Sequence, residues 1–484
     1  MQRKFVTNLA LVLSLNLLIK PIWVFGIEVA VQNAVGTEQY GFYYAIFNFS
    51  FLLNILLDFG ITNFNNKNIS QNNHLLSKHL SSIILLRLLL AGIFVIVTII
   101  GGFVIGYTDD MIKMLIAVLF NQVLISFIMY LRSNLAGLHM FKTDSLISIL
   151  DRLIMIVLCG VLLIKYNKPG EFDIRWFIYA QTAGYLTTAF ITLIIVMKKA
   201  RIRKLQWRWP FFVMILKKSY PYAVLVLLMT FYNRIDGVML ERLLPFRIGA
   251  HEAGIYASAY RLLDASNMIA FLFAGLLLPI FARMIKLRQN VEEMVRLAFS
   301  LLVVPAFIVA TCSYFFSYDI MDMLYKGNHI EESASVFRIL MCCFIPISTT
   351  YIFGTLLTAN GNLRQLNIMA TAGMVFNIVL NFILIPKYSA TGAAISSIST
   401  QAFTALAQIF MAQMAFGFRR NYMLILKLLL FVCGIIGINL IVSHIPVYWI
   451  SQLIISFSAC FTLALVIKLI SIRNIYRIIK YEEE

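Results

Sequence analysis

Apolar stretches of about twenty residues recur from one end of this chain to the other. A helix of that length crosses the hydrocarbon core of a bilayer. So many stretches indicate that the bilayer is the solvent for the whole fold. Lipid cannot hydrogen-bond the backbone, so each crossing must be a helix or part of a closed barrel. The stretches are too long and too uniformly apolar for barrel strands, which alternate over about ten residues.

Composition agrees with a chain immersed in lipid. Of the 484 residues, 61% are hydrophobic and 13% are charged, whereas soluble domains carry about 25% charged residues. We therefore expect an all-α membrane protein with about fourteen transmembrane helices. The predicted crossings span residues 9–31, 41–61, 81–106, 111–131, 144–164, 174–197, 219–240, 254–280, 297–317, 334–358, 365–385, 391–415, 423–443 and 448–470. The first stretch ends in no small-residue cleavage site, so we expect a membrane helix there and not a signal peptide.

Basic residues are divided unequally between alternate loops. With a cytoplasmic N-terminus, 26 of the 40 Lys and Arg residues lie in inside segments and about eight lie outside. Cytoplasmic loops collect Lys and Arg, so the pattern predicts a multi-pass protein of the bacterial inner membrane with both termini in the cytoplasm. The net charge of +18 is mainly this topology signal, and no nucleic-acid partner is expected.

Two stretches of the sequence echo each other. Residues 36–45 match residues 250–259 when Gly41 is aligned with Gly254, an offset of 213. A second echo pairs Ala136-Gly137 with Asn360-Gly361 at an offset of 224. The similar offsets indicate a duplicated unit of six helices, whose copies point the same way because six is even. Chance similarity among apolar, glycine-rich helices is the alternative.

The repeat predicts four parts. They are an N-terminal six-helix lobe at 1–200, a basic cytoplasmic interfacial linker at 201–218, a C-terminal six-helix lobe at 219–416, and two extra transmembrane helices with a cytoplasmic tail at 417–484. Transporters built from such parallel repeats bind substrate between the lobes.

Three cations inside predicted crossings are the candidate substrate-binding residues: Lys20, Arg234 and Arg261. Shifting Lys20 by the repeat offset of 213 reaches residue 233, next to Arg234. The three could line one cavity, where a cation holds phosphate or pyrophosphate strongly and arginine offers a bidentate fork. The alternative is that Arg234 pairs with Asp236 and Arg261 with Asp264.

Other polar residues and one proline in the crossings are further candidates. Arg87 and Arg338 lie near helix ends, where a long side chain can reach the membrane surface. Asp144 and Arg152 are a candidate structural ion pair. Pro21 is a candidate hinge. Four acids are candidates for ion coupling or for lining the cavity: Glu28, Asp58, Asp236 and Asp264.

Three blocks of sequence resemble the polysaccharide-export flippases of the multidrug/oligosaccharidyl-lipid/polysaccharide exporter superfamily. The first runs from Gly36 to Asp58-Phe59-Gly60, and the second runs from Tyr232-Asn-Arg-Ile-Asp236 through Gly254 and Arg261 to Pro279. The third contains Asn360-Gly361, Asn377 to Asn381, Leu384-Ile-Pro386 and Gly392-Ala-Ala394. The blocks cover nearly the whole chain in the family's order.

The resemblance implies a flippase that moves an undecaprenyl-pyrophosphate-linked oligosaccharide, such as an O-antigen unit for lipopolysaccharide, from the inner to the outer leaflet. It implies a cavity lined by cations and a transport cycle driven by an H⁺ or Na⁺ gradient. Membrane lipids and the machinery that polymerises and assembles the polysaccharide are the implied partners. No cofactor is expected.

Other functions remain open. A lipid II flippase also fits, whereas a multidrug antiporter usually carries cationic drugs, which surplus cations would repel. An enzyme such as a polymerase or glycosyltransferase needs catalytic groups on a sizeable loop, and the loops here are short. A channel fits less well than alternating access. The scattered histidines and cysteines predict neither a metal site nor a catalytic residue.

Overall fold

The chain is described by a computed structural model, which covers residues 15, 18, 19, 21–62, 65, 69, 75–138, 140–166, 171–200, 207, 209–325, 329–418 and 422–469. Within these ranges the secondary structure is helical, and no strand occurs. Each predicted crossing overlaps at least one helix. The chain divides into two compact units, Met1–Gly254 and Ile255–Glu484.

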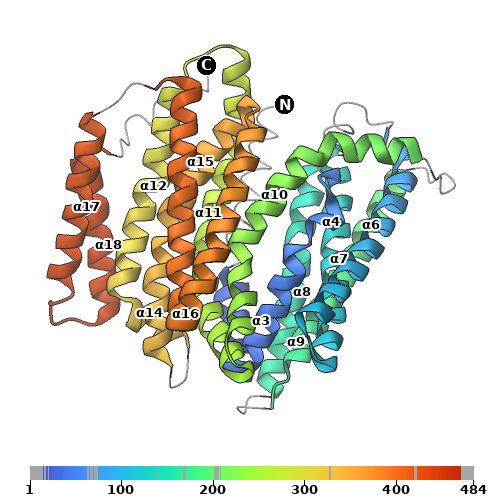
Figure 1. The fold of residues 1–484 in the computed structure, drawn as a ribbon, viewed down its shortest axis with the longest axis horizontal. Helices are drawn as coiled ribbons and strands as arrows, with labels where there is room; N and C mark the ends of the chain where they lie inside the picture. Colours follow the sequence, from blue (N-terminus) through green and yellow to red (C-terminus); the bar gives the residue numbers. More distant parts are fainter. Residues whose placement is uncertain are drawn as a thin grey trace. The chain divides into compact units, whose positions relative to one another are not determined.

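The described residues of the first unit form the following helical elements or parts of elements. They are η1 (Ile22–Glu28), α2 (Val29–Val35), α3 (Thr37–Leu52), α4 (Ile55–Asp58), α6 (Leu75–Ile105), α7 (Asp109–Gly137), α8 (Phe141–Lys165), α9 (Ile174–Lys199), α10 (Trp209–Leu243) and the start of α11 (Phe246–Lys286) (Figure 1).

The second unit begins within α11 and holds the rest of the chain. Its further helices are α12 (Glu292–Phe315), α13 (Ser317–Leu324), α14 (Ile330–Cys342), α15 (Phe344–Asn360), α16 (Leu363–Phe416), α17 (Tyr422–Val442) and α18 (Trp449–Val466).

Ten helical segments in the described part of the chain are long and apolar enough to cross a membrane. This confirms an all-helical protein that crosses the membrane many times. The count of fourteen crossings stays a prediction, because several expected crossings fall on helices that are too short or too incompletely described to be assessed in this way.

The long helix α16 contains the break that the sequence predicts between residues 385 and 391. At Ser389 the backbone has φ 48° and ψ −131°, so two helices meet there at a kink. Pro386, just before the kink, lacks the N–H that a continuous helix would use. A Cβ atom on Gly392 would lie 2.3 Å from the carbonyl oxygen of Leu384. Glycine is therefore required for the two backbones to approach this closely.

A buried apolar cluster joins α6, α7, α9 and α10 in the first unit. Leu80 and Leu86 of α6 and Leu131 of α7 are buried there, together with Phe212 and Ile215 from the start of α10. The ring of His79 stacks on Phe211 with centroids 4.6 Å apart. This packing holds the start of α10 against the N-terminal part of α6.

The last two helices pack on α12 in the second unit. Ile308 and Cys312 of α12 form a buried cluster with Phe431 and Ile435 of α17 and with Cys460 of α18. Most other side chains of α17 and α18 are exposed, as expected for helices that face lipid.

The predicted division into four domains stays a prediction. Residues 201–206 and 208 of the expected interfacial linker lie outside the described residues. Of the described part of that linker, Trp207 precedes α10, and residues 209–218 belong to α10.

Candidate functional site

Arg234 lies in the C-terminal half of α10 and is half-buried. Its guanidinium lies 5.4 Å from the ring centroid of Phe51 on α3. A cation over an aromatic face gains about 0.5–2 kcal/mol, more where water is excluded. The contact places the guanidinium beside α3.

The sequence around Arg234 explains its orientation. Tyr232 and Asp236 are both buried, and they share a face of α10 because they are four residues apart. Arg234 is two residues from each and therefore projects from the other side of the helix. At Gly237 a Cβ atom would lie 2.7 Å from Tyr44 and 2.9 Å from Asn48, so α10 packs tightly on α3 at this point.

The other two candidate cations are placed differently. Arg261 lies on α11 in the second unit and is half-buried, as is Asp264 three residues on. Lys20 lies outside the described residues. The expected convergence of Lys20, Arg234 and Arg261 on one cavity therefore stays a prediction, as do the cavity roles of Asp236 and Asp264.

Asp58 at the end of α4 belongs to an ion-pair network. Its carboxylate accepts hydrogen bonds from the backbone and hydroxyl of Thr62 and from Nη2 of Arg87 on α6. Arg87 Nη1 donates to the carbonyl and hydroxyl oxygens of Ser126 on α7 at 2.8 and 2.9 Å. The guanidinium also lies 4.9 Å from the ring centroid of Tyr130. The network joins α4, α6 and α7, whereas its predicted role in ion coupling remains untested.

The expectation that Arg87 reaches the membrane surface is wrong. Its side chain is only 5% exposed, and it is neutralised inside the bundle by Asp58. An arginine with an internal carboxylate partner has no need to extend to water. Arg338 on α14 is half-buried, and its Nε donates to Ser317 Oγ at 2.5 Å.

The predicted ion pair between Asp144 and Arg152 is also wrong. Asp144 at the start of α8 pairs with Arg132 near the end of α7, with 2.7 Å between Nε and Oδ1. The eight residues between Asp144 and Arg152 correspond to a rise of about 12 Å along a helix, too far for contact. Sequence reasoning missed Arg132, although the short turn that joins α7 to α8 brings these helix ends together.

Arg152 instead belongs to a second polar cluster. Its guanidinium lies 5.2 Å from the ring of Trp23 and 5.9 Å from the ring of Tyr185, and Nε is 3.9 Å from Asp151. The indole N–H of Trp23 donates to Glu28 Oε1 at 2.9 Å, and the Glu28 carboxylate interacts electrostatically with Arg152. The cluster places one acid of the predicted ion-coupling set beside a cation in the first unit.

Pro21 precedes a segment of unusual helix. Residues Ile22–Glu28 form the π-helix η1, which continues into α2. π-Helical turns are rare and are frequent at functional sites. The irregular segment ends at Glu28, so the backbone distortion and the buried carboxylate coincide. The hinge role of Pro21 stays a prediction.

Sequence comparison assigns the chain to a family. A family model described as polysaccharide biosynthesis protein matches residues 6–285, more than half of the chain. The protein belongs to this polysaccharide biosynthesis family. No curated protein matches the chain.

Solved structures similar to this member of the family are transporters by their titles. A structure of the lipid II flippase MurJ in an inward closed conformation aligns with a TM-score of 0.72 and 14% identity, over 94% of this chain and 98% of that one. An inward-facing multidrug resistance MATE transporter of the MOP superfamily aligns with a TM-score of 0.60 and 16% identity, over 84% of this chain and 94% of that one.

A third similar structure is a MOP superfamily transporter from Pyrococcus furiosus, whose title reports reversed polarity of its binding pocket. It aligns with a TM-score of 0.55 and 14% identity over 86% of this chain and 95% of that one. These identities show the fold alone. The family member has the all-helical fold of MurJ and MATE transporters, which confirms the expected fold class.

Proposed function

We propose that this protein is a flippase for an undecaprenyl-pyrophosphate-linked oligosaccharide. It carries a repeat unit of O-antigen or another surface polysaccharide from the inner to the outer leaflet of the bacterial inner membrane by alternating access. The observation that carries the proposal is the family match, which spans residues 6–285 and includes Lys20, Arg234 and Arg261.

The chemistry of the substrate fits the charges in the membrane. A pyrophosphate that crosses a bilayer loses most of its hydration, and cations in a medium of low dielectric constant compensate for that loss. Arginine binds phosphate oxygens through paired N–H donors. Arg234 lies against the ring of Phe51, and Arg234 and Arg261 are both half-buried. With Lys20, they would provide the positive charge that the substrate needs.

The driving force is proposed to be an H⁺ or Na⁺ gradient. Glu28 is the acid best suited to such a role, because it is buried at the end of the π-helix and accepts a hydrogen bond from Trp23, the ring over which Arg152 lies. Loading or release of a cation there would change the charge balance around Arg152. The polysaccharide polymerase and its assembly machinery would receive the flipped substrate.

A lipid II flippase is the second candidate. The specific observation in its favour is the TM-score of 0.72 with MurJ. Lipid II and an O-antigen precursor share the polyprenyl pyrophosphate, so the same cations would serve both. A multidrug antiporter is disfavoured, because the surplus of arginine and lysine would repel cationic drugs.

Genetic complementation tests the proposal and separates the two candidates. The gene is expressed in one strain that lacks its O-antigen flippase and in another in which MurJ is depleted. Restored surface polysaccharide in the first strain, without rescue of growth in the second, supports the proposed function. The opposite result assigns lipid II, and failure in both strains, with normal amounts of the protein in the membrane, would overturn the proposal.

A further inference from the structure

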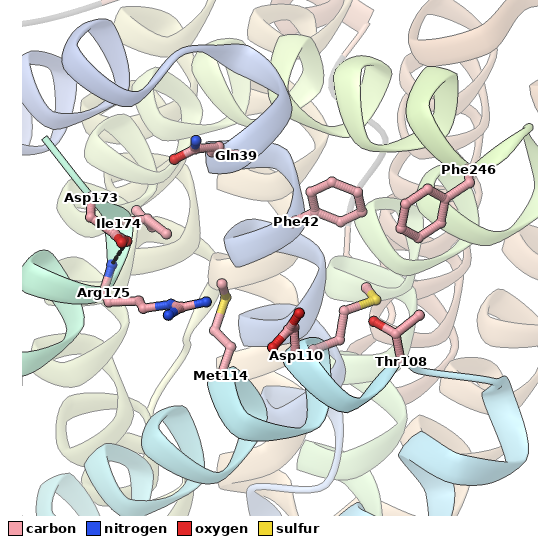
Figure 2. A pocket seen from close by; sticks show the side chains of 10 residues that line it. Gln39, Phe42, Thr108, Asp110, Met114, Asp173, Ile174, Arg175 and Phe246 are labelled. Atoms are coloured by element: carbon pink, nitrogen blue, oxygen red, sulfur yellow. Dashed lines mark hydrogen bonds between the residues drawn. The ribbon is translucent and has the colours of Figure 1, made fainter. Parts of the chain in front are cut away.

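A pocket of about 320 Å³ opens in the first unit where α3, α7, α9 and α11 begin. Its lining residues come from the first two turns of these helices or from the residue just before them, and Figure 2 shows their side chains. Ligand pockets in proteins range over about 300–1,000 Å³, so this volume suits one or two small rings. The predicted topology places this end of the unit on the outer side of the membrane.

The wall of the pocket is apolar and partly aromatic. Phe42 of α3 and Phe246 of α11 face each other with ring centroids 5.1 Å apart and planes inclined at 44°. Met111 and Met114 of α7 continue this surface. Flat aromatic rings and flexible thioethers offer an apolar surface that adapts to the C–H face of a ring.

Polar groups stand around this apolar wall. Arg175 extends its guanidinium toward Met114 of α7 (Figure 2), and Gln39 of α3 is a further polar residue of the lining. Asp110 forms an exposed ion pair with Lys113 at 3.1 Å. Asp173 caps α9 by accepting a hydrogen bond from the backbone N–H of Arg175 at 2.8 Å, which fixes the start of that helix.

The lining of the pocket carries charges of both signs. Asp110, which pairs with Lys113, and Asp173 are acidic, and Arg175 is basic. A cationic ligand would meet Arg175, and an anionic ligand would meet Asp110 and Asp173. A neutral ligand with many hydroxyl groups avoids both penalties. Each hydroxyl both donates and accepts, so it can bond to a carboxylate, which only accepts, and to a guanidinium, which only donates.

We propose that this pocket binds a neutral sugar ring of the transported oligosaccharide. The sugar would lay an apolar C–H face on Phe42 and Phe246, and its hydroxyls would bond to Arg175, Gln39 and Asp110. This inference rests on the proposed function, since the sugar belongs to the lipid-linked substrate. Binding at the outer end would hold the sugar after its transfer and oppose its return.

Saturation-transfer NMR on the full-length protein in detergent tests the pocket directly. The probes are methyl glycosides of glucose, galactose, rhamnose, N-acetylglucosamine and N-acetylgalactosamine. At least one probe should bind to the wild-type protein. Arg175→Gln and Phe246→Ala should each weaken that binding about tenfold, because each removes a principal contact.

Matched variants serve as controls. Arg247→Gln changes an exposed arginine on the turn of α11 next to Phe246, and Phe103→Ala truncates an exposed phenylalanine of α6. Neither residue lines the pocket, so both variants should bind the sugar as the wild type does. Equal losses in the control and pocket variants would overturn the assignment.

A lipid headgroup is the competing occupant, and soluble glycerophosphoethanolamine provides its probe. Binding of that probe without any sugar would overturn the proposal, as would binding of no probe at all. The complementation strains distinguish this failure from failure of the proposed function. A wild-type protein that restores surface polysaccharide but binds no glycoside disproves the sugar pocket alone, whereas glycoside binding without complementation in either strain disproves the flippase proposal.

Discussion

Gly41 of α3 and Gly254 of α11 each pack against the backbone of the other helix. A Cβ atom on Gly41 would lie 1.8 Å from the carbonyl oxygen of Ala250, and one on Gly254 would lie 2.0 Å from that of Thr37. The contact is reciprocal, because the sequence repeat relates residues 37 and 41 to residues 250 and 254. Reciprocal contact is typical of copies related by a two-fold axis, so it supports duplication over chance similarity.

Replacing either glycine should separate α3 from α11. Gly41→Ala and Gly254→Ala should each cost about 3 kcal/mol, since the new methyl group meets a backbone carbonyl that cannot rotate away. The same substitutions would also strain two polar contacts nearby. Gln32 Nε2 donates to the Gly254 carbonyl at 3.0 Å, and Thr37 contacts His251 at 2.9 Å. The midpoint of thermal unfolding in detergent is the measurement.

Gly92→Ala in α6 is the control, because nothing lies within 4 Å of a Cβ atom at that position. Alanine favours a helix over glycine by up to about 1 kcal/mol, so this variant should be as stable as the wild type or slightly more stable. An unchanged midpoint for Gly41→Ala would contradict the close packing.

Removing the candidate cations should stop transport without unfolding the protein. Arg234→Ala and Arg261→Ala should each lower the export of surface polysaccharide at least about tenfold, because each removes charge-assisted bonds to phosphate. Arg261→Asp should be worse than Arg261→Ala, since a carboxylate repels phosphate. Arg234→Lys should retain part of the activity.

Surface polysaccharide is measured in the complementation strain, with the amount of protein in the membrane measured alongside. Lys286→Ala is the control for Arg261→Ala, because it removes an exposed cation from the end of the same helix. Export at the normal rate by the Arg234→Ala/Arg261→Ala double variant would refute the site.

Removing one charge of the Asp58–Arg87 pair should destabilise the protein more than removing both. Asp58→Asn leaves Arg87 buried without its counter-charge and should cost about 3 kcal/mol. The double change Asp58→Asn with Arg87→Met should cost less, because no buried charge remains. Unfolding midpoints of the two single variants and the double variant provide the test, and strictly additive losses would argue against the pair.

Asp144 should be energetically coupled to Arg132 and not to Arg152. In a double-mutant cycle, Asp144→Asn and Arg132→Gln should show an interaction energy of about 0.5–1 kcal/mol, as expected for a partly exposed pair. The cycle of Asp144→Asn with Arg152→Gln should be additive within about 0.5 kcal/mol. A larger coupling to Arg152 would favour the original sequence interpretation over the structural contact.

The partners in the ion pairs were the part of the site that sequence reasoning predicted least well. The sequence shows that Arg87 lies near the end of a predicted crossing, and this position predicts a side chain that reaches the surface. It does not show that Asp58, which lies on another helix, packs against Arg87. Arg152 was assigned to Asp144 because both lie on one helix, yet Asp144 is paired across a turn with Arg132. Spacing along one helix gives the face of a residue and says nothing of the neighbouring helix.

The sequence by itself determined that this is a multi-pass helical membrane protein of the polysaccharide biosynthesis family. Lipid imposes that result, because only long apolar helices satisfy their backbones there, and their pattern is local along the chain. Only the tertiary structure decided that Arg87 is neutralised inside the bundle, that Arg132 is the partner of Asp144, and that Phe42 faces Phe246 in a pocket. Such contacts join residues far apart in the chain, so they depend on which helices pack together, which no local pattern specifies.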